Sequence, residues 1–395
     1  MSEHLSTDTI LACLLPLCLF MISFAWLGSP TTLMRTIVDM VKGGRTLSGP
    51  YEYFSVERAA ASFDQYFELS TSELTAMRRS YGKLGRKHKR LGYELSYPAK
   101  LDKLQATIEA NDKVAREIGR CARESFPQLR HNRILGDGDL ARVRETLKHF
   151  IRDWSADGAS ERDVIFKPIL NALNVDPHSR RADTKILVPG SGLGRLAWEI
   201  SELGFDTTAV ELSHFMTLGY RFLCSPSFTD KINQHTLHPY SYWFSHQRTN
   251  NDLFRGVSFP DAIPRLHPRM RLVEGDFLQQ RAHGDGYDYV VTLFFIDTSV
   301  NVISTIEHIY SLLRPGGRWI NLGPLLWPGG AQARVELNLE EVLQLATMTG
   351  FRLEEGAATP KVYQRHSVPC EYTADRHAMM KWIYQAEFWV AQKPT

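Results

Sequence analysis

The sequence predicts an α/β fold in which a helical region precedes a mainly parallel β-sheet. Two observations carry this prediction. From Lys185 onward, short runs rich in β-branched residues alternate with stretches of helical periodicity, which is typical of right-handed βαβ units. Between Tyr51 and about Arg130, apolar residues recur at spacings of three and four, which indicates amphipathic helices. The 395 residues suffice for a large buried core.

Composition narrows the class of function. Apolar residues make up 43% and charged residues 23% of the chain, which is typical of a folded globular protein. The 46 basic residues nearly balance the 44 acidic ones, which argues against a nucleic-acid-binding protein with its clear basic excess. The five cysteines show no metal-ligand spacing, so no zinc site is expected. Their odd number and wide spacing also argue against a disulfide framework, and we expect a reducing compartment.

The N-terminal segment, residues 1–50, departs from this pattern. Residues 10–27 form a run of 18 residues without a charge, at the lower limit for crossing a bilayer. Acidic residues precede the run where a cleaved signal peptide would carry basic ones, which argues against such a peptide. The first Lys and Arg residues follow the run, which predicts that the chain after it lies in the cytosol. We therefore expect a membrane anchor followed by a linker. The alternatives are a short amphipathic or buried helix, or a start codon chosen too far upstream.

The next region, residues 51–184, is expected to be helical. Ser70 or Thr71 is expected to cap its second helix. Seven Lys or Arg residues lie between Arg78 and Arg90, and we interpret them as a solvated helix face in preference to a nucleic-acid or nuclear-import patch. A later helix is predicted from Ala141 to Trp154.

Residues 185–395 are expected to form the sheet and its covering helices. The predicted strands are short, buried runs at Ile186–Val188, Thr207–Val210, Arg271–Val273, Tyr289–Leu293 and Trp319–Leu322. Helices are predicted between several of them, at Arg195–Leu203, Phe215–Leu223 and Asn301–Leu313. In such a sheet the carboxyl ends of the strands meet at one edge, where ligands bind.

The first predicted strand leads directly into a glycine-rich loop. Gly190, Gly192 and Gly194 form the pattern GxGxG, and a helix begins at the next residue. Glycines at these positions allow a sharp turn and a close approach of the backbone to a ligand. The second strand ends at Glu211, where a carboxylate can accept both hydroxyls of a ribose. Loop and acid together predict a nucleoside-cofactor site in a Rossmann-like sheet.

Two cofactors fit this pairing, a dinucleotide and S-adenosylmethionine. The dinucleotide pattern is GxGxxG, whereas this loop reads GxGxG. The third predicted strand is followed by Gly275, Asp276 and Phe277, where the Asp can hydrogen-bond an adenine amino group with the Phe beside the base. This order of motifs favours S-adenosylmethionine, and therefore a methyltransferase, over NAD.

The chain also resembles the carnosine N-methyltransferase family, the N2227-like group of class I methyltransferases, from about residue 55 to 395. The stretches that carry the resemblance are RVRETLKHFIRDWS (142–155), ERDVIFKPIL (161–170), ILVPGSGLGRLAWEIS (186–201), VELSHFM (210–216), HPYSYWFSHQRTNNDLFRGVSFPD (238–261), EGDF (274–277), FFIDTSVNVISTIEHIYSLLRPGGRWINLGPLLW (294–327) and MMKWIYQAEFWVAQKP (379–394). The N-terminal apolar run lies outside this pattern, and members of the family are otherwise cytosolic or nuclear.

The resemblance implies an S-adenosylmethionine-dependent methyltransferase whose N-terminal helices close over the cofactor. His149 and Arg152, three residues apart on one helix face, match a Gln and an Arg that reach the methionine carboxylate in the family. Arg152 keeps the charge that suits a carboxylate, and His149 can still donate. The alternative is an exposed polar helix face. The remaining cofactor contacts implied by the resemblance are Gly190, Glu211, Asp276, Phe277 and Leu293.

For the substrate, the resemblance implies methylation of an imidazole nitrogen in a histidine-containing dipeptide, carnosine to anserine. Asp297 follows the fourth predicted strand and is the implied catalytic residue, which accepts a hydrogen bond from the imidazole N–H and aims the other nitrogen at the methyl group. The alternative for Asp297 is a cap of the following helix. Phe294, Tyr372 and Tyr384 are expected to contact the dipeptide, the alternative being core packing.

Two departures from the family pattern concern the substrate. The family commonly reads GPLLYH with the His contacting the dipeptide, whereas Pro328 stands there in this chain and lacks both a side-chain donor and a backbone N–H. Trp382 replaces a usual Tyr. Histidine in another peptide or in a protein is therefore an alternative substrate.

Functions of three different kinds compete with this reading of the sequence. They are methylation of another small amine or thiol, a membrane-tethered scaffold, and a cofactor-binding module that has lost catalysis, which the presence of Asp297 disfavours. No metal site is expected, and the pattern leaves open whether the chain acts as a monomer or a homodimer.

Overall fold

The computed structural model describes residues 55–130, 138–175, 181–282, 284–328, 332–357 and 359–395. The predicted membrane anchor at 10–27 lies outside these ranges. Among the described helices, none combines the length and hydropathy that crossing a bilayer requires. Phe54–Thr395 forms one compact unit, and the predicted division between residues 51–184 and 185–395 falls inside it.

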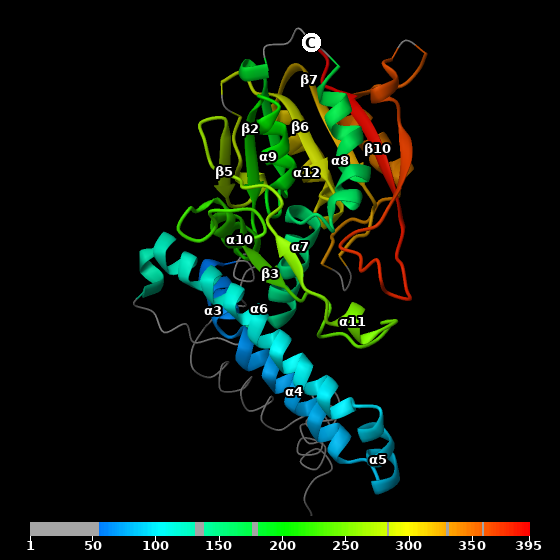
Figure 1. Cartoon of the computed structure of the whole chain (residues 1–395). Coiled ribbons are helices and arrows are strands. Elements are labelled where there is room, and N and C mark those ends of the chain that lie inside the picture. Colours follow the sequence, from blue (N-terminus) through cyan, green and yellow to red (C-terminus); the bar gives the residue numbers. More distant parts are fainter. Residues whose placement is uncertain (1–54, 131–137, 176–180, 283, 329–331, 358) are drawn as a thin grey trace, which may run out of the picture. The chain divides into compact units, whose positions relative to one another are not determined.

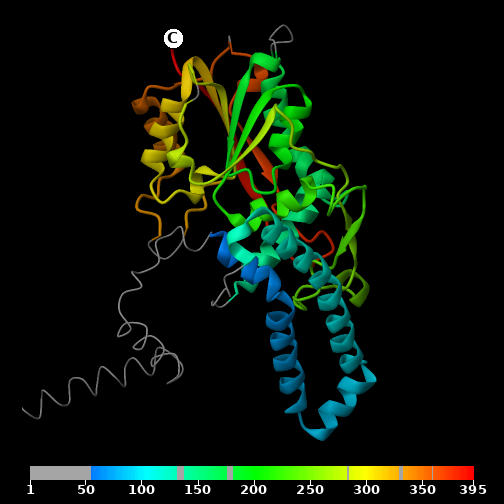
Figure 2. The same cartoon turned by 90° about the vertical axis from the view of Figure 1, so that its left-hand side faces the viewer.

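The helical region contributes α3 to α8 (Figure 1). Their bounds are α3 (Val56–Asp64), α4 (Tyr66–Gly82), α5 (Arg86–Glu94), α6 (Tyr97–Ser125), α7 (Leu140–Trp154) and α8 (Ala159–Leu173), with a 3₁₀ turn, η2 (Pro127–Arg130), after α6. In Figure 2, α4 and α6 run side by side as a hairpin whose far end is α5. α5 has no buried residue, which agrees with a solvated basic face.

The expected helix cap at Ser70 or Thr71 is wrong. α4 begins at Tyr66 and runs through both residues. Tyr66, Ser70 and Leu74, four residues apart, are its buried side chains, and packing of this stripe against α6 overrides the local capping preference of a hydroxyl residue.

The sheet has the order β5-β2-β1-β6-β7-β10-β8, with β9 paired to β10. The strands are β1 (Lys185–Pro189), β2 (Asp206–Glu211), β5 (Met270–Glu274), β6 (Tyr287–Leu293), β7 (Leu313–Gly323), β8 (Arg352–Leu353), β9 (His366–Cys370) and β10 (Tyr384–Gln392). The five predicted strands pair in parallel, which confirms the predicted α/β sheet. β10 is antiparallel to its three neighbours and, like β8 and β9, was not predicted.

The strand order reverses at β1, between β2 and β6, and ligands bind at such a switch point. Helices cover both faces of the sheet (Figure 2). The helices that follow β1, β2, β6 and β7 are α9 (Arg195–Glu202), α10 (His214–Cys224), α12 (Val302–Leu312) and α13 (Leu339–Thr349), respectively. The short 3₁₀ turns of this region are η3 (Arg181–Asp183), η4 (Phe277–Gln279), η5 (Ile296–Thr298) and η6 (Lys361–Tyr363).

Two hydrophobic cores flank the sheet. Ile186 and Val188 of β1 belong to one core, whereas Leu187 belongs to the other, because successive side chains of a strand point to opposite faces. Phe63 of α3 and Phe150 of α7 lie in the same core as Ile186. The helical region and the sheet therefore share one hydrophobic core.

A two-stranded ribbon packs against α6 and α7. It consists of β3 (His235–Leu237) and β4 (Val257–Phe259), with α11 (Asn250–Leu253) between them. Asn111 of α6 donates to the carbonyl of His238 (3.1 Å) and accepts from its N–H (2.7 Å). This pair of hydrogen bonds fixes the start of the segment that leads to α11.

Candidate active site

The glycine loop between β1 and α9 has a backbone that favours glycine. Gly190, Gly192 and Gly194 have φ values of 62°, 55° and 74°, in the left-handed region that other residues rarely adopt. A Cβ on Gly190 would clash with the ring of Phe295, and one on Gly194 would lie 2.9 Å from the ring of Tyr220. A Cβ on Gly192 would meet no atom within 4 Å. The middle glycine therefore faces open space that a ligand can approach.

Glu211 ends β2 beside this loop. Its carboxylate accepts hydrogen bonds from the backbone N–H groups of Gly192 (2.8 Å) and Ser213 (2.8 Å). Burial raises the pKa of Glu211, and the two amide donors act against that shift. The neighbouring Ser191 has a buried hydroxyl oxygen without a hydrogen-bond partner in the described structure. The loop thus presents polar groups suited to a ligand that carries hydroxyls.

The residues after β5 lie near the same loop. Asp276 accepts from the backbone N–H of Leu278 (2.9 Å) and so caps η4. The ring of Phe277 is buried and meets Phe295 edge-on at a centroid distance of 5.3 Å. Because Phe295 also faces Gly190, one ring connects Phe277 to the glycine loop. Leu293 is half-buried at the end of β6.

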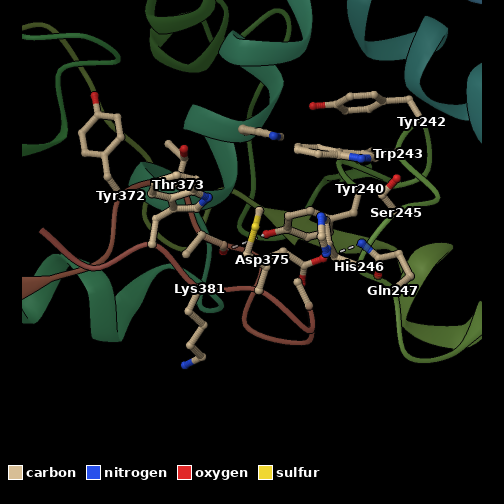
Figure 3. A pocket seen from close by; sticks show the side chains of 15 residues that line it. Tyr240, Tyr242, Trp243, Ser245, His246, Gln247, Tyr372, Thr373, Asp375 and Lys381 are labelled. Carbon is tan, nitrogen blue, oxygen red and sulfur yellow. Dashed lines mark hydrogen bonds between the residues drawn. The ribbon is translucent and has the colours of Figure 1, made fainter. Parts of the chain in front are cut away.

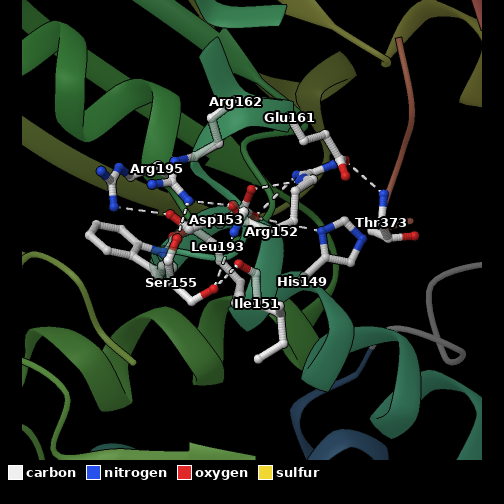
Figure 4. A network of polar contacts seen from close by, with 12 residues as sticks. His149, Ile151, Arg152, Asp153, Ser155, Glu161, Arg162, Leu193, Arg195 and Thr373 are labelled. Atoms are coloured by element: carbon white, nitrogen blue, oxygen red, sulfur yellow. Dashed lines mark hydrogen bonds and ion pairs between the residues drawn. The ribbon is translucent and has the colours of Figure 1, made fainter. Parts of the chain in front are cut away.

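The last turns of α7 bring a cation and an imidazole into the interior (Figure 4). Arg152 donates to Asp153 through Nε (2.7 Å) and Nη2 (3.1 Å). His149 is 4% exposed, and its Nδ1, 3.6 Å from Asp153, has no hydrogen-bond partner among the described atoms. The alternative of an exposed polar helix face is therefore wrong, because α7 packs this face inward.

Charge and ring contacts hold this group together. Burial opposes ionisation of Asp153, but the Arg152 cation and the adjacent His149 together keep the pKa of Asp153 well below its usual range. The guanidinium of Arg152 lies 4.5 Å from the ring centroid of Tyr372, within cation–π distance. His149 meets the same ring edge-on at 5.7 Å. The structure thus places Tyr372, a predicted substrate residue, in contact with the predicted cofactor residues His149 and Arg152.

A buried polar network joins α7 and α8 to the glycine loop. Trp154 donates from Nε1 to the carbonyl of Leu193 (2.9 Å). Asp261 accepts from Arg195 at the start of α9 (2.5 Å) and from Arg162 of α8 (2.6 Å). Sequence patterns do not single out this network, since its members lie far apart in the chain. Their position within stretches that match the family is the one signal that marks them.

Asp297 lies in η5, directly beyond β6, and is 5% exposed. Its Oδ2 accepts from the backbone N–H of Leu326 (3.0 Å). Burial raises the pKa of Asp297 to about 6, and the Leu326 N–H acts against that shift. Asn301 caps α12, since its side chain accepts from the N–H of Ile303. The alternative that Asp297 is the helix cap is therefore wrong.

The three predicted substrate aromatics meet at Phe294, three residues before Asp297. Phe294 stacks on Tyr372 with centroids 4.7 Å apart and meets Tyr384 edge-on at 5.7 Å. Phe294 has a φ of 51°, a left-handed value that costs about 1–3 kcal/mol for a bulky residue and is typical of functional sites. A buried carboxylate can accept an N–H from a flat ring, and aromatic side chains can stack on such a ring.

Tyr372 is held in place from α8. Both oxygens of Glu161 accept backbone N–H groups of the C-terminal loop, from Thr373 (2.7 Å) and Ala374 (3.3 Å); Figure 4 shows Glu161 opposite Thr373. No local motif pointed to Glu161, because its partners lie more than 200 residues further along the chain. This carboxylate positions the loop that carries Tyr372.

Burial of Asp297 predicts a pH-dependent loss of stability. Its pKa is about 6 in the fold against an ordinary value of 3.8, so the folded state binds the proton more tightly. The resulting penalty is absent below about pH 4, grows between about pH 4 and 6, and is complete above about pH 6. Its size is at most about 3 kcal/mol.

We therefore expect Asp297→Asn to unfold at a higher temperature than the wild type at about pH 8, and this difference should shrink toward about pH 4. Thermal unfolding across this pH range measures it. The exposed Asp163 on α8 offers a matched control, since Asp163→Asn makes the same substitution on the surface. Equal midpoints of Asp297→Asn and the wild type at both extremes would contradict the prediction.

Comparison with known proteins adds independent findings. A family model described as carnosine N-methyltransferase matches residues 131–395. The carnosine N-methyltransferase of Mus musculus is 34% identical over 314 residues, 75% of this chain and 76% of that protein. The carnosine N-methyltransferase of Schizosaccharomyces pombe is 30% identical over 368 residues, 85% of this chain and 95% of that protein. Among solved structures, a putative methyltransferase from Bacillus halodurans is 12% identical, with a TM-score of 0.36 over 58% of this chain and 99% of that chain.

Proposed function

The chain belongs to the carnosine N-methyltransferase family, and we propose that it methylates an imidazole nitrogen of carnosine to give anserine. It is an S-adenosylmethionine-dependent methyltransferase. The observation that carries the choice of an imidazole substrate is the buried carboxylate of Asp297, three residues after Phe294, whose ring contacts those of Tyr372 and Tyr384. An imidazole substrate supplies an N–H that the carboxylate can accept and a flat ring on which the aromatic side chains can pack.

The described residues fit the cofactor. The open space at Gly192 and the half-buried carboxylate of Glu211 suit a ligand with ribose hydroxyls, and the Arg152 cation suits a ligand carboxylate. Bound there, S-adenosylmethionine supplies a methyl group on a sulfonium, which is a good leaving group. We assign contacts with the methionine carboxylate to His149 and Arg152, since Asp153 engages two of the guanidinium donors and a guanidinium has five. We assign the other contacts to Gly190, Gly192, Gly194, Glu211, Asp276, Phe277 and the backbone of Leu293.

Asp297 is the proposed catalytic residue. A neutral imidazole nitrogen is already nucleophilic near pH 7, so the protein needs to select the tautomer and aim the ring. With a pKa of about 6, Asp297 is ionised at neutral pH and accepts the imidazole N–H. Its charge also offsets the positive charge that the ring gains. Phe294, Tyr372 and Tyr384 enclose the ring.

Pro328 favours a second candidate, a histidine in another peptide or in a protein. The loop that carries Pro328 lies on the proposed catalytic residue, because Leu326 donates to Asp297. Trp327 fixes the same loop by donating from Nε1 to the carbonyl of Leu337 (2.9 Å). The residue at position 328 therefore lies close to the proposed substrate site, and a proline there offers no hydrogen-bond donor to a dipeptide.

Pro328→His is expected to raise kcat/KM for carnosine. One added hydrogen bond to the dipeptide corresponds to roughly a 2- to 10-fold gain. Steady-state kinetics with carnosine measure it. Pro328→Ala is the matched control, because it restores the backbone N–H without a side-chain donor and should leave kcat/KM close to that of the wild type. No gain in Pro328→His, or an equal gain in both variants, would show that this loop is built for another substrate.

A methyl-transfer assay tests the proposed function. The protein is incubated with S-adenosylmethionine labelled in the methyl group, and with carnosine, related histidyl dipeptides or a cell lysate. We expect the label in anserine when carnosine is supplied. Label that enters only lysate protein would favour the second candidate. No label in any imidazole, with the cofactor still bound, would refute imidazole methylation.

We also propose that residues 10–27 attach the full-length protein to a membrane with the catalytic unit in the cytosol. The support is the uncharged run and the basic residues that follow it. Carbonate extraction of cells that express the full-length chain tests this. We expect the protein in the membrane pellet and a variant without residues 1–50 in the supernatant. Recovery of the full-length chain in the supernatant would overturn the proposal.

A further inference from the structure

A second pocket adjoins the proposed imidazole site (Figure 3). Its volume is about 220 Å³, and it lies between the C-terminal loop and the segment that precedes α11. Aromatic side chains from both segments form much of its wall: Tyr240, Tyr242, Trp243, Tyr372 and Trp382. Apart from Tyr372, none of these has a role in the reaction proposed above.

The pocket has a cation without a matching anion. Lys148 of α7 lines it, with Nζ 5.4 Å from the ring centroid of Tyr242 and 6.0 Å from that of Trp243. In the described part of the chain, no carboxylate forms an ion pair with Lys148. Lys381, by contrast, pairs with Glu371 (2.9 Å) and extends away from the rings in Figure 3. Lys148 is thus the pocket cation suited to a ligand carboxylate.

The pocket also has an acceptor that lacks a donor. Gln247 donates from Nε2 to Asp375 (3.0 Å), and a carboxylate can only accept, so this contact fixes which amide atom is the nitrogen. The other amide atom, Oε1, is buried without a hydrogen-bond partner in the described structure. Asp375 is itself neutralised by Arg255 (2.5 Å). A ligand N–H would satisfy Oε1 of Gln247.

Tyr372 connects the pocket to the imidazole site. It lines the pocket and also stacks on Phe294 in the turn that carries Asp297. Trp382 and Tyr384 form a second connection between the pocket and the imidazole site. Trp382 lines the pocket, and Tyr384, two residues further along the chain, contacts Phe294. A substrate that extends beyond its imidazole along this loop reaches the pocket.

We propose that this pocket is a subsite for one further residue of the substrate, an aromatic residue that follows histidine and carries the terminal carboxylate. This inference rests on the proposed function. The rings match an aromatic side chain, Lys148 matches the carboxylate, and Oε1 of Gln247 matches the added peptide N–H. Carnosine ends at its histidine and has no further aromatic side chain or peptide N–H for this pocket, so the subsite favours a histidyl peptide one residue longer.

The test compares carnosine with β-alanyl-histidyl-phenylalanine, its C-terminal amide and β-alanyl-histidyl-glycine. We expect the phenylalanine peptide to have a KM roughly 10-fold below that of the glycine peptide, since an aromatic side chain is buried. Trp243→Ala should remove this difference, and Lys148→Gln should remove the preference for the free acid over the amide. Neither variant should change the kinetics with carnosine.

Controls separate the subsite from general damage. Lys381→Gln alters the other pocket lysine and should behave as the wild type, and thermal midpoints establish that each variant is folded. Equal KM values for the phenylalanine and glycine peptides in the wild type would overturn the subsite. So would an equal loss for carnosine and the phenylalanine peptide in Trp243→Ala.

The outcomes also distinguish the subsite from the proposed function. Methylation of the phenylalanine peptide without methylation of carnosine would refute carnosine as the substrate and support the subsite. If no peptide is methylated while the cofactor binds, the proposed function fails. Calorimetry with the phenylalanine peptide then decides the subsite, because binding lost in Trp243→Ala supports it and an absence of binding overturns it.

Discussion

Asp297→Asn is expected to abolish methyl transfer while cofactor binding stays nearly intact. The amide has the size of the carboxyl group, and its oxygen can still accept from the Leu326 N–H. It lacks the charge that offsets the positive imidazole, and its NH₂ group faces the substrate with a donor where an acceptor is needed. A loss of roughly 10²- to 10⁴-fold in kcat is expected for such a group.

Two measurements define this result. Single-turnover kinetics with carnosine report the chemical step, and calorimetry with S-adenosylmethionine reports cofactor affinity. Asp297→Glu keeps the charge but moves it, so we expect partial activity, whereas Asp163→Asn on the surface of α8 should retain full activity. An equal loss of cofactor affinity and turnover in Asp297→Asn would contradict a role confined to the substrate.

Glu211→Gln is expected to weaken cofactor binding by roughly 10- to 100-fold, as the loss of a charged, half-buried acceptor implies. The carboxylate accepts from Gly192 and Ser213 and has lone pairs left for ribose hydroxyls. A glutamine offers one acceptor oxygen and turns an NH₂ group toward a backbone donor. The variant should therefore lose both order in the loop and contact with the ribose.

Calorimetry with S-adenosylmethionine measures this change. At saturating cofactor, kcat should approach that of the wild type, which separates Glu211 from Asp297. Glu202 at the end of α9 is exposed, and Glu202→Gln provides the control for loss of a carboxylate away from the glycine loop. Unchanged affinity in Glu211→Gln would refute the ribose assignment.

Local sequence patterns predict the parts of this site whose geometry is set by residues that are adjacent in the sequence. A strand, a glycine loop and a helix follow one another directly, so the loop at Gly190 and the position of Glu211 could be predicted and lie together in the fold. The same holds for the five parallel strands, which are buried β-branched runs. β8, only two residues long, and the antiparallel β9 and β10 depend on pairing across the sheet, and short edge strands lack a strong local signal.

Sequence alone thus determined the five parallel strands, the glycine loop and the family, because these depend on local periodicity and on motifs of consecutive residues. Tertiary structure decided which polar side chains are buried. It placed His149 and Arg152 inside under Tyr372, gave capping of α12 to Asn301 and left Asp297 buried with a pKa of about 6. Burial and desolvation arise from packing between distant segments, and no local pattern contains them.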